Sequence, residues 1–497
     1  MHAPSLAARA ALAVALMIGF YVLAAVLIVG LLSVPYFEYH YIDRVDLRIG
    51  LASIGAAIGI LVGIAPRIDK FQPPGVELLP AKQPRLFTVL DALATATGQA
   101  RPKSVYLIGD LNAWVAQRGG IMGIGGRRVM AIGLPLLETL DVGEMRGVLA
   151  HEFGHYHGGD TALGPWIYQT RGAIGRTLDQ LSGYHKLIQT PFTLYGKTFL
   201  KVTLAISRRQ EYAADALAAR IVGVDTVGSG LTTINRTAPA FLSFWQTEYD
   251  PALAEGFRPP VVAGFRAFLA QPVIARRTSQ LLSQELESGS AGTYDTHPAL
   301  RERLAALSAL GELPAPPPTG AASDRAPALS LLDDLESLEA ALTKTLAPKD
   351  RANKLQAIAW SNVGEHVWIP RWRRVARAKM PRLRGLTLAA LGNPAFDFEG
   401  LAVNMGIRTP NKGERARQLA AALGAPIVIA LHANGWTLEA MLGQPIGLRK
   451  DGVAIAPFLA IEQLAAAVVE PGAWRTFTEL SGLGNTDFSA MAPQAKT

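Results

Sequence analysis

The chain contains no cysteine. This absence excludes a thiol nucleophile, a zinc site with cysteine ligands and any disulfide bond. It does not indicate a cellular compartment. Any metal or catalytic site in this chain must therefore be built from other side chains.

A recognised nucleic-acid-binding motif is also missing. The net charge of +8 therefore does not predict a nucleic-acid partner, and it suits contact with anionic lipid head groups. The glycine-rich segment from Gly119 to Gly126 lacks the Gly-Lys-Ser/Thr sequence of a phosphate-binding loop, so we interpret it as a hairpin tip. The length of 497 residues predicts more than one domain, and a hydrophobic content of 49% can build a sizeable core.

The most informative motif that is present runs from His151 to His155 and reads HEFGH. On a helix, residues four apart leave the same face one turn apart, so both imidazoles can bind one Zn²⁺. Glu152 lies beside the first histidine, where it can take a proton from a water molecule. Two core histidines bonded to backbone carbonyls, beside a surface glutamate, are the alternative interpretation.

The surroundings of the motif favour the metal site. Asp141 and Glu144 have the spacing of a capping box, which predicts the start of a helix upstream of His151. Met145, Val148 and Leu149 then fall at core spacing, and Gly158 and Gly159 are predicted to end the helix.

A catalytic zinc site needs a third protein ligand and one open position. His157 is two residues past His155 and points to another face of the helix. Thr161 stands where the HExxHxxGxxH pattern has its third histidine. Glu211 and Asp215 lie four apart on one predicted helical face, so one acid can bind the metal while the other holds a ligand histidine from behind. Solvated acids on an ordinary amphipathic helix are the alternative, and the upstream motif favours the ligand.

HEFGH followed by SRRQEYAADALAA resembles the membrane zinc endopeptidases of the HtpX type, which are relatives of the type I CAAX prenyl protease. The resemblance covers roughly residues 80 to 310. It includes Asn112-Ala113, the approach to the motif over residues 128–137, and THPALRERL, which is similar to the family element THPxxxxRL. It implies an α+β, mainly helical, zincin-like protease domain of gluzincin type with a small edge sheet.

The resemblance also implies roles for particular residues. His151, His155 and Glu211 would bind one Zn²⁺ per chain, Glu152 would be the general base, and Asp215 would orient a histidine. Further site residues would lie along the cleft. Asn112 and Ala113 would belong to the edge strand that pairs with substrate, and His297 and Arg303 would lie near the cleft.

The residues themselves agree with these roles to different degrees. Residues 105–108 and 111–116 have the composition of strands, and an edge strand binds extended peptides through main-chain hydrogen bonds. His297 can donate to a developing oxyanion, or it can be an N-terminal helix residue with Pro298 at the first helical position. Both interpretations stay open. For Arg303 a structural ion pair is favoured over substrate contact.

Two apolar runs at the N-terminus predict membrane spans. Ala10 to Val34 carries no charge and is long enough to cross the hydrocarbon core, and Ile49 to Pro66 is just long enough. A cleaved signal peptide is the alternative for the first run, but that run is longer than a signal core and a second follows closely. Arg9 before the first run and Arg67 after the second place the catalytic domain in the cytoplasm, on a multi-pass protein of the inner (plasma) membrane.

The interval between the two parts of the site contains charged residues throughout and no uncharged run long enough to span. We interpret it as amphipathic helix and loop. This departs from relatives with further spans there, so a prenyl protease with an enclosed chamber and a CAAX substrate is not expected.

The composition of the sequence also divides the chain into predicted domains. We predict a two-helix anchor at 1–70, a peptidase domain at 71–310, a Pro/Ala-rich linker at 311–329 and an accessory domain at 330–497. The accessory domain is predicted to be mixed α/β. Its expected parts are an amphipathic helix at 329–346, a buried strand at 426–431 and a hairpin turn at 450–452. His366 and His432 are isolated there and indicate no catalytic site.

Residues 368–379 of this domain combine arginines with tryptophan. Such a segment suits a membrane interface or an acidic partner, and an ordinary solvated helix face explains it equally well. The hypothesis is that the domain docks on the bilayer or regulates access to the cleft.

The sequence therefore predicts a membrane-anchored zinc endopeptidase that acts on protein or peptide substrates. A proteolytically silent membrane scaffold or regulatory binding protein is the alternative. An aminopeptidase would need a group that binds the free amine, and the sequence identifies none. Membrane-protein quality control is implied only by the resemblance, and the oligomeric state is left open.

Overall fold

The computed structural model describes residues 6–69, 71–121, 126–155, 164–290, 297–311, 324–348, 350–468 and 471–491. The chain divides into two compact units. The first unit comprises Met1–Ala238 and Ser279–Leu342, and the second comprises Pro239–Thr278 and Thr343–Thr497. The described residues are mostly helical with small sheets, which confirms the mainly helical α+β composition expected from the sequence.

The second unit includes residues 239–278, although the sequence predicts them in the peptidase domain. Aromatic packing is the physical reason. The ring of Phe244 lies 5.5 Å from that of Phe265 and 5.8 Å from that of Trp360, measured between centroids. Most of the predicted linker, residues 312–323, lies outside the described residues, so the predicted domain boundaries stay predictions.

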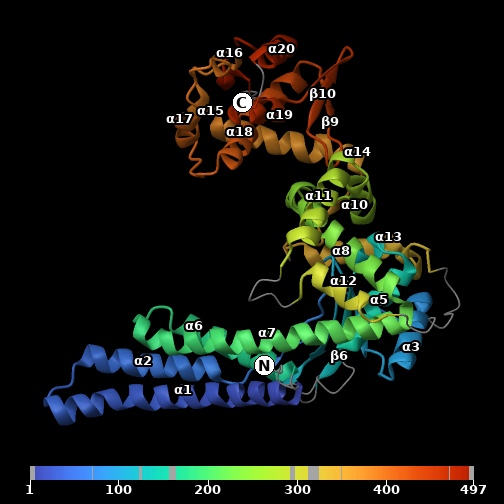
Figure 1. Ribbon diagram of the computed structural model, residues 1–497. Coiled ribbons are helices and arrows are strands. Elements are labelled where there is room, and N and C mark those ends of the chain that lie inside the picture. Colours follow the sequence, from blue (N-terminus) through green and yellow to red (C-terminus); the bar gives the residue numbers. More distant parts are fainter. Residues whose placement is uncertain are drawn as a thin grey trace. The chain divides into compact units, whose positions relative to one another are not determined.

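Two apolar helices form a hairpin at the N-terminus (Figure 1). They are α1 (Leu6–Ile42) and α2 (Leu47–Ile64), and both are long and apolar enough to cross a membrane. Asp46 begins α2 because its carboxylate accepts a hydrogen bond of 2.8 Å from the backbone N–H of Arg48. Large apolar side chains on the pair, such as Val26 and Leu51, are exposed, as lipid contact requires.

The interval between the two parts of the site forms a second helix hairpin, α6 (Gly164–Gln180) and α7 (Lys186–Val222). Figure 1 shows it running alongside α1 and α2. The Tyr195 hydroxyl donates to the Leu16 carbonyl at 2.6 Å across this contact. The shared apolar cluster contains Phe20, Ala24, Ala56, Ile60, Ala173, Ile174, Leu181, Phe192 and Phe199. Because α7 is continuous, it extends from this cluster to the site that contains Glu211.

A four-stranded sheet supports the site. Its strand order is β2 (Val76–Leu78), β3 (Ser104–Ile108), β6 (Arg127–Gly133) and β4 (Ala113–Arg118). Only the β3–β6 pairing is parallel. β4 lies at one edge of this sheet, opposite β2, and Asn112 directly precedes it. A Cβ at Gly133 would lie 2.0 Å from the Asp110 carbonyl oxygen, so this crossing requires glycine. A separate short pair joins β1 (Ile68–Asp69) and β5 (Gly120–Ile121).

The helix that contains the HEFGH motif begins as predicted. After α3 (Pro84–Thr97) and α4 (Leu134–Thr139), Asp141 caps α5 (Val142–Gly154) through a complete capping box with Glu144. Met145 and Leu149 are fully buried. The helix ends at Gly154 with His155 as its C-cap, which is earlier than predicted, and residues 158 and 159 lie outside the described part.

The segment after the predicted linker binds the start of α5. The N–H groups of Val142 and Gly143 donate to the carbonyls of Ala326 and Asp324, each at 2.8 Å. A short 3₁₀ turn (Ala328–Leu331) and α13 (Leu335–Leu346) then replace the single helix predicted at 329–346. The first unit also contains α12 (Leu300–Ser308) and most of α8 (Val224–Phe244).

The second unit is built around α18 (Lys412–Ala433). The prediction of a buried strand at 426–431 is wrong, because these residues lie inside α18. A short, wholly apolar run has no period, so it does not distinguish a strand from a helix buried on all sides. By length and composition α18 could also cross a membrane, but its apolar window is 72% buried by the protein itself. Packing within the unit therefore accounts for its hydrophobicity.

A small sheet completes this unit, with β9 (Thr437–Glu439), β10 (Gly447–Lys450) and β11 (Val453–Ile455) in antiparallel order. The predicted hairpin turn is confirmed, since Asp451 and Gly452 connect β10 to β11 with φ of 50° and 82°. The other helices and strands of the unit are α9 (Asp250–Ala254), β7 (Phe257–Arg258), α10 (Val261–Leu269), β8 (Gln356–Ala357), α14 (Trp360–Val363), α15 (Ile369–Leu383), α16 (Leu388–Leu391), α17 (Phe398–Asn404), α19 (Pro457–Ala465) and α20 (Pro471–Ser481). Helix α11 (Pro272–Ser288) begins in this unit, and its residues from Ser279 on belong to the first unit.

Candidate metal centre

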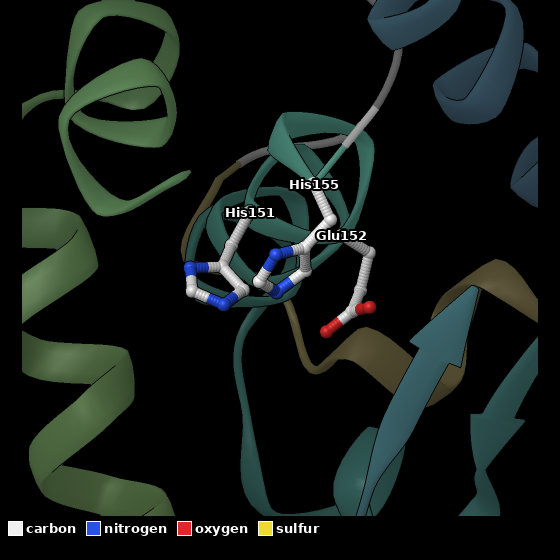
Figure 2. Close-up of side chains that lie close together, drawn as sticks. All are labelled: His151, Glu152 and His155. Carbon is white, nitrogen blue, oxygen red and sulfur yellow. The ribbon is translucent and has the colours of Figure 1, made fainter. Parts of the chain in front are cut away.

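Helix α5 presents two imidazoles on the same side. The ring centroids of His151 and His155 are 4.8 Å apart and the rings are nearly perpendicular, at 87°. Figure 2 shows the two rings and the Glu152 carboxylate gathered at the end of this helix. Potential ligand atoms of these three residues all lie within 4.8 Å of one another. This is the arrangement expected when positions four apart on one helix share a cation.

Helix α7 brings a carboxylate to the same place. Glu211 Oε2 lies 3.5 Å from His151 Nε2, and Glu211 Oε1 lies 3.6 Å from His155 Nε2. Tetrahedral zinc with ligand bonds of about 2.0–2.1 Å separates its ligand atoms by about 3.3–3.4 Å. Both distances from Glu211 to the histidines are therefore close to the separation of two ligands on one zinc ion.

The electrostatics of this cluster also fit a cation. Glu211 is 5% exposed, and its Oε2 atom receives no well-aligned hydrogen bond. Burial would raise the pKa of Glu211, but His151 and His297 outweigh that effect and hold the pKa below its ordinary value. A buried anionic oxygen without an aligned donor is a site where a metal ion can replace a proton.

The two histidines differ in their protonation. Burial lowers the pKa of His155 to about 4, so its imidazole is neutral and able to bind a metal at physiological pH. Burial lowers the pKa of His151 as well, but Asp215 and Glu211 outweigh it and raise the pKa to about 9. A cation at His151 Nε2 would therefore compete with protonation of this ring.

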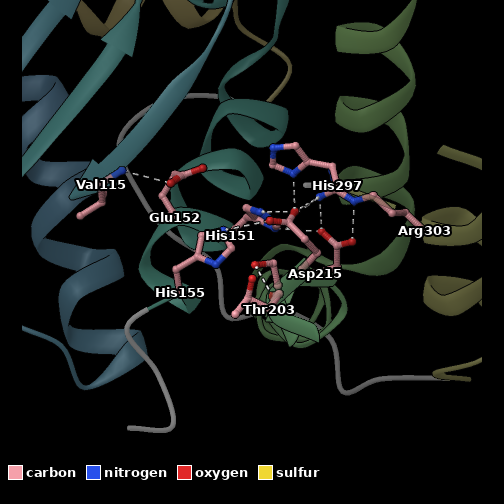
Figure 3. A network of polar contacts seen from close by, with 10 residues as sticks. Val115, His151, Glu152, His155, Thr203, Asp215, His297 and Arg303 are labelled. Carbon is pink, nitrogen blue, oxygen red and sulfur yellow. Dashed lines mark hydrogen bonds and ion pairs between the residues drawn. The ribbon is translucent and has the colours of Figure 1, made fainter. Parts of the chain in front are cut away.

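A second layer holds His151 from behind. Asp215 is 2% exposed, and its Oδ1 atom lies 2.9 Å from His151 Nδ1. This contact assigns the Nδ1 proton to the side of Asp215 and leaves Nε2 directed at Glu211. Arg303 of α12 donates to both oxygens of Asp215, at 2.6 and 2.8 Å. Figure 3 shows this chain of contacts from Arg303 through Asp215 to His151.

Arg303 belongs to the same buried network. Its Nη2 atom also lies 3.8 Å from Glu211 Oε2, so one guanidinium faces two carboxylates. The Arg303 side chain is 12% exposed. The structure thus places Arg303 in an ion pair beneath the cluster, while part of it still lines the adjoining cavity.

Glu152 is held against the edge strand. The backbone N–H of Val115 in β4 donates to Glu152 Oε2 at 3.2 Å, as Figure 3 shows. Burial raises the pKa of Glu152 to about 7, partly opposed by the nearby His151. A carboxyl group with such a pKa can both accept and return a proton near neutral pH.

His297 lies on the open side of the cluster. Its Nδ1 atom is 2.9 Å from Glu211 Oε2, and its side chain is 64% exposed. Helix α12 begins only at Leu300, so Pro298 is not at the first helical position and that part of the alternative prediction is wrong. His297 instead precedes the helix and lies over the Glu211 carboxylate (Figure 3).

A cavity of about 280 Å³ adjoins the cluster. Its walls come from the edge segment, the HEFGH helix, α8 and the start of α12, and they include Asn112, Ala113, Val148, Leu231, Ile234 and Pro298. Asn112 and Ala113 thus lie beside His151 and Glu152, while His157 falls outside the described residues.

The contribution of α8 is absent from the sequence analysis. Val227, Leu231 and Ile234 all line the cavity, and they follow one another at intervals of four and three residues. This apolar stripe was a visible signal of a buried helix face. It contains no chemical motif, however, and nothing in it indicates a cleft. The hydrogen bond from Val115 to Glu152 could not be predicted from the sequence either, because Val115 contributes only its backbone N–H.

Comparison with known proteins matches this part of the chain. The model of peptidase family M48 matches residues 80–310. A protein named "Protease HtpX homolog" from Acidiphilium cryptum (strain JF-5) is 31% identical over 246 residues, which are 46% of this chain and 75% of the relative. A protein of the same name from Paraburkholderia phytofirmans is 26% identical over 243 residues, or 45% of this chain and 73% of the relative. No solved structure matches the chain.

Proposed function

The chain belongs to the HtpX-type membrane metalloproteases of peptidase family M48, and from this premise we propose that it is a zinc-dependent endopeptidase. One observation carries the proposal. Glu211 comes from a different helix, yet its two oxygens lie 3.5 and 3.6 Å from the Nε2 atoms of His151 and His155. Two core histidines and a solvated acidic helix face, the alternative interpretations, give no reason for Glu211 to lie against both imidazoles.

The proposed ligands of a single Zn²⁺ are His151, His155 and Glu211. Two neutral imidazoles and one carboxylate form a ligand set that zinc enzymes use, with a fourth position open. Zinc held there would polarise a peptide carbonyl and lower the pKa of a water molecule. Asp215 would keep His151 in the tautomer that presents Nε2, and Arg303 would act through Asp215 as a positioning residue.

Glu152 is the proposed general base. Its carboxylate accepts a proton from the attacking water and later passes that proton to the leaving amine. Two observations support this role: the carboxyl group is fixed by the Val115 N–H, and its pKa is raised to about 7. A pKa near 7 lets the carboxylate accept the proton from water and then release it to the leaving amine.

His297 is proposed to stabilise the oxyanion that develops on the scissile carbonyl. Because Nδ1 donates to the Glu211 carboxylate, Nε2 can donate into the cleft when the ring is in its doubly protonated, imidazolium form. Its exposed position makes this contact possible without moving the helix behind it. The observed contact with Glu211 also orients the ring.

Protein or peptide substrates are proposed to bind in extended form along β4. Asn112 and Ala113 lie at the start of that edge and line the cavity beside the cluster. An edge strand supplies main-chain hydrogen bonds, which do not depend on substrate sequence. The apolar walls at Val148 and Leu231 favour an apolar substrate side chain in the cavity.

The proposed location is the inner (plasma) membrane, with α1 and α2 as anchors and the site on the cytoplasmic side. Arg67 lies shortly after α2, which ends at Ile64, and Arg176 donates to the Gly63 carbonyl at the same end of that helix. Cations at this end favour a cytoplasmic position. A role in membrane-protein quality control stays a prediction.

The proposal is tested by comparing the wild type with Glu152→Gln. The purified wild type should digest casein, lose that activity with a zinc chelator and regain it when zinc is returned. Glu152→Gln should keep bound zinc and lose activity by about 100-fold or more, because it removes only the proton acceptor. A zinc-loaded wild type that cleaves nothing would instead support the silent scaffold, and full activity of the variant would refute the assigned base.

A further inference from the structure

The second unit exposes a concentrated basic face on α15. Residues 368–384 contain seven basic side chains and no acidic one. These are Arg371, Arg373, Arg374, Arg377, Lys379, Arg382 and Arg384. All but Lys379 are on exposed positions of the helix or its C-cap. Helical spacing places Arg371 and Arg382 along one edge of the exposed side of α15, and Arg373 and Arg377 along the other edge. We call this exposed side, with these four arginines, the basic face.

The charge of the basic face is poorly neutralised by the protein. Arg374 forms an ion pair with Glu255, and Arg384 lies near Asp487. Among the described residues, no carboxylate forms an ion pair with the four arginines of the basic face. Arg373 and Arg377 are four apart on the helix, an arrangement in which like charges destabilise it. An anionic ligand would remove that repulsion.

The opposite side of α15 is core. Ile369 and Leu383 are 2% and 0% exposed, and Trp372 is 8% exposed and stacks on Trp368. Trp372 is therefore a core residue, and Trp368 is partly buried against the same core. The exposed side of α15 therefore presents mainly basic side chains to a partner.

An exposed apolar side chain flanks the basic face. Val403 in α17 is 67% exposed. Helix α17 lies against the C-terminal part of α15, because Asn404 Nδ2 donates to the Arg382 carbonyl at 3.4 Å and Lys379 Nζ donates to the Met405 carbonyl at 3.3 Å. Cations beside an exposed apolar residue are typical of surfaces that lie at a lipid interface.

We propose that the basic face docks on the anionic phospholipid head groups of the membrane in which the chain is anchored. Charge complementarity selects an anionic surface. Among polyanions, a membrane is the favoured partner because α1 and α2 anchor the chain in a bilayer. This tether raises the effective concentration of the second unit at the surface of that bilayer. This inference does not depend on the peptidase activity.

The test uses the full chain in lipid nanodiscs. Because the protein has no cysteine, a single substitution gives a unique label. Ala378→Cys places a fluorophore on the exposed side of α15, and Ala421→Cys on the exposed side of α18 is the matched control in the same unit. Nitroxide-bearing lipid head groups then quench only a fluorophore that lies near them.

In nanodiscs with about one third phosphatidylglycerol, the label at 378 should be quenched about threefold more than in phosphatidylcholine alone. Raising the salt to about 0.5 M should reverse much of this difference, because screening weakens exposed charges. The label at 421 should not distinguish the two lipids. The triple variant R371Q/R373Q/R377Q should abolish the difference at 378, while its thermal unfolding stays close to that of the parent because these side chains are exposed.

Two results would overturn the proposal. One is equal quenching at 378 in neutral and anionic lipid. The other is a label at 378 that responds to an added RNA oligonucleotide or acidic peptide but not to phosphatidylglycerol, which would make the face a site for a different polyanion. If the triple variant unfolds early, Val403→Ser with all arginines intact provides the second arm, and it should reduce quenching in anionic nanodiscs.

Discussion

At the scale of single residues, the site depends on side chains that act in layers. Asp215 contacts His151, and Arg303 contacts Asp215. Each outer residue fixes the orientation or charge of the one in front of it. Conservative changes should therefore separate positioning from chemistry.

Asp215→Asn should weaken zinc binding by about 10–100-fold, because an amide holds the His151 Nδ1 proton less firmly than a carboxylate does. The zinc Kd of purified protein, measured by competition with a chelating dye, checks this. Asp225→Asn on the exposed start of α8 is the matched control. An unchanged Kd for Asp215→Asn would show that the contact does not tune the ligand.

Arg303→Met should destabilise the fold by about 3–5 kcal/mol, because it leaves the buried Asp215 carboxylate without its cation. Thermal unfolding in detergent measures the loss. Adding Asp215→Asn to this variant should recover part of it, since the orphaned charge is then gone. Additive losses in the double variant would contradict a direct coupling of the two residues.

At the scale of elements, the site is made by the crossing of α5 and α7. Gly154 lies at that crossing, where an added Cβ would lie 2.8 Å from the Cα of Ala214. The helices can approach closely only because this residue has no side chain. The distance between His155 and Glu211 depends on this approach.

Gly154→Ala should therefore separate the helices, lower the unfolding temperature and reduce bound zinc. Gly175→Ala in α6 is the matched control, because its Cβ would meet nothing within 4 Å. That control should be neutral or stabilise the protein by about 0.5–1 kcal/mol, as alanine does in a helix interior. Equal zinc content and equal unfolding temperatures for both variants would show that the crossing has room for a side chain.

Some helices could be predicted from the sequence because a local motif marks them, and others could not. The capping box at Asp141 specifies its own helix start, so α5 was predictable from sequence. Residues 426–431 carry no periodicity, so their helix was not. The cavity wall from α8 contains an apolar stripe but no polar signal. The contact between Val115 and Glu152 depends on how the sheet packs against α5, so neither segment predicts it by itself.

At the scale of the whole molecule, the units do not follow the order of the sequence. Residues 239–278 join the second unit, while residues 324–342 return to the first, where they bind the start of α5. Removing residues 330–497, the predicted accessory domain, would therefore also remove α13 and part of the first unit. Point variants on the intact chain are the better probes of the second unit.

Glu211 is proposed to complete a metal site with His151 and His155. The most direct test is the zinc content of Glu211→Gln after dialysis against buffered zinc, with Glu302→Gln of α12 as the control. The wild type and the control should each hold about one zinc per chain, and Glu211→Gln should hold far less at the same free zinc. Wild-type zinc content and affinity in Glu211→Gln would contradict the account.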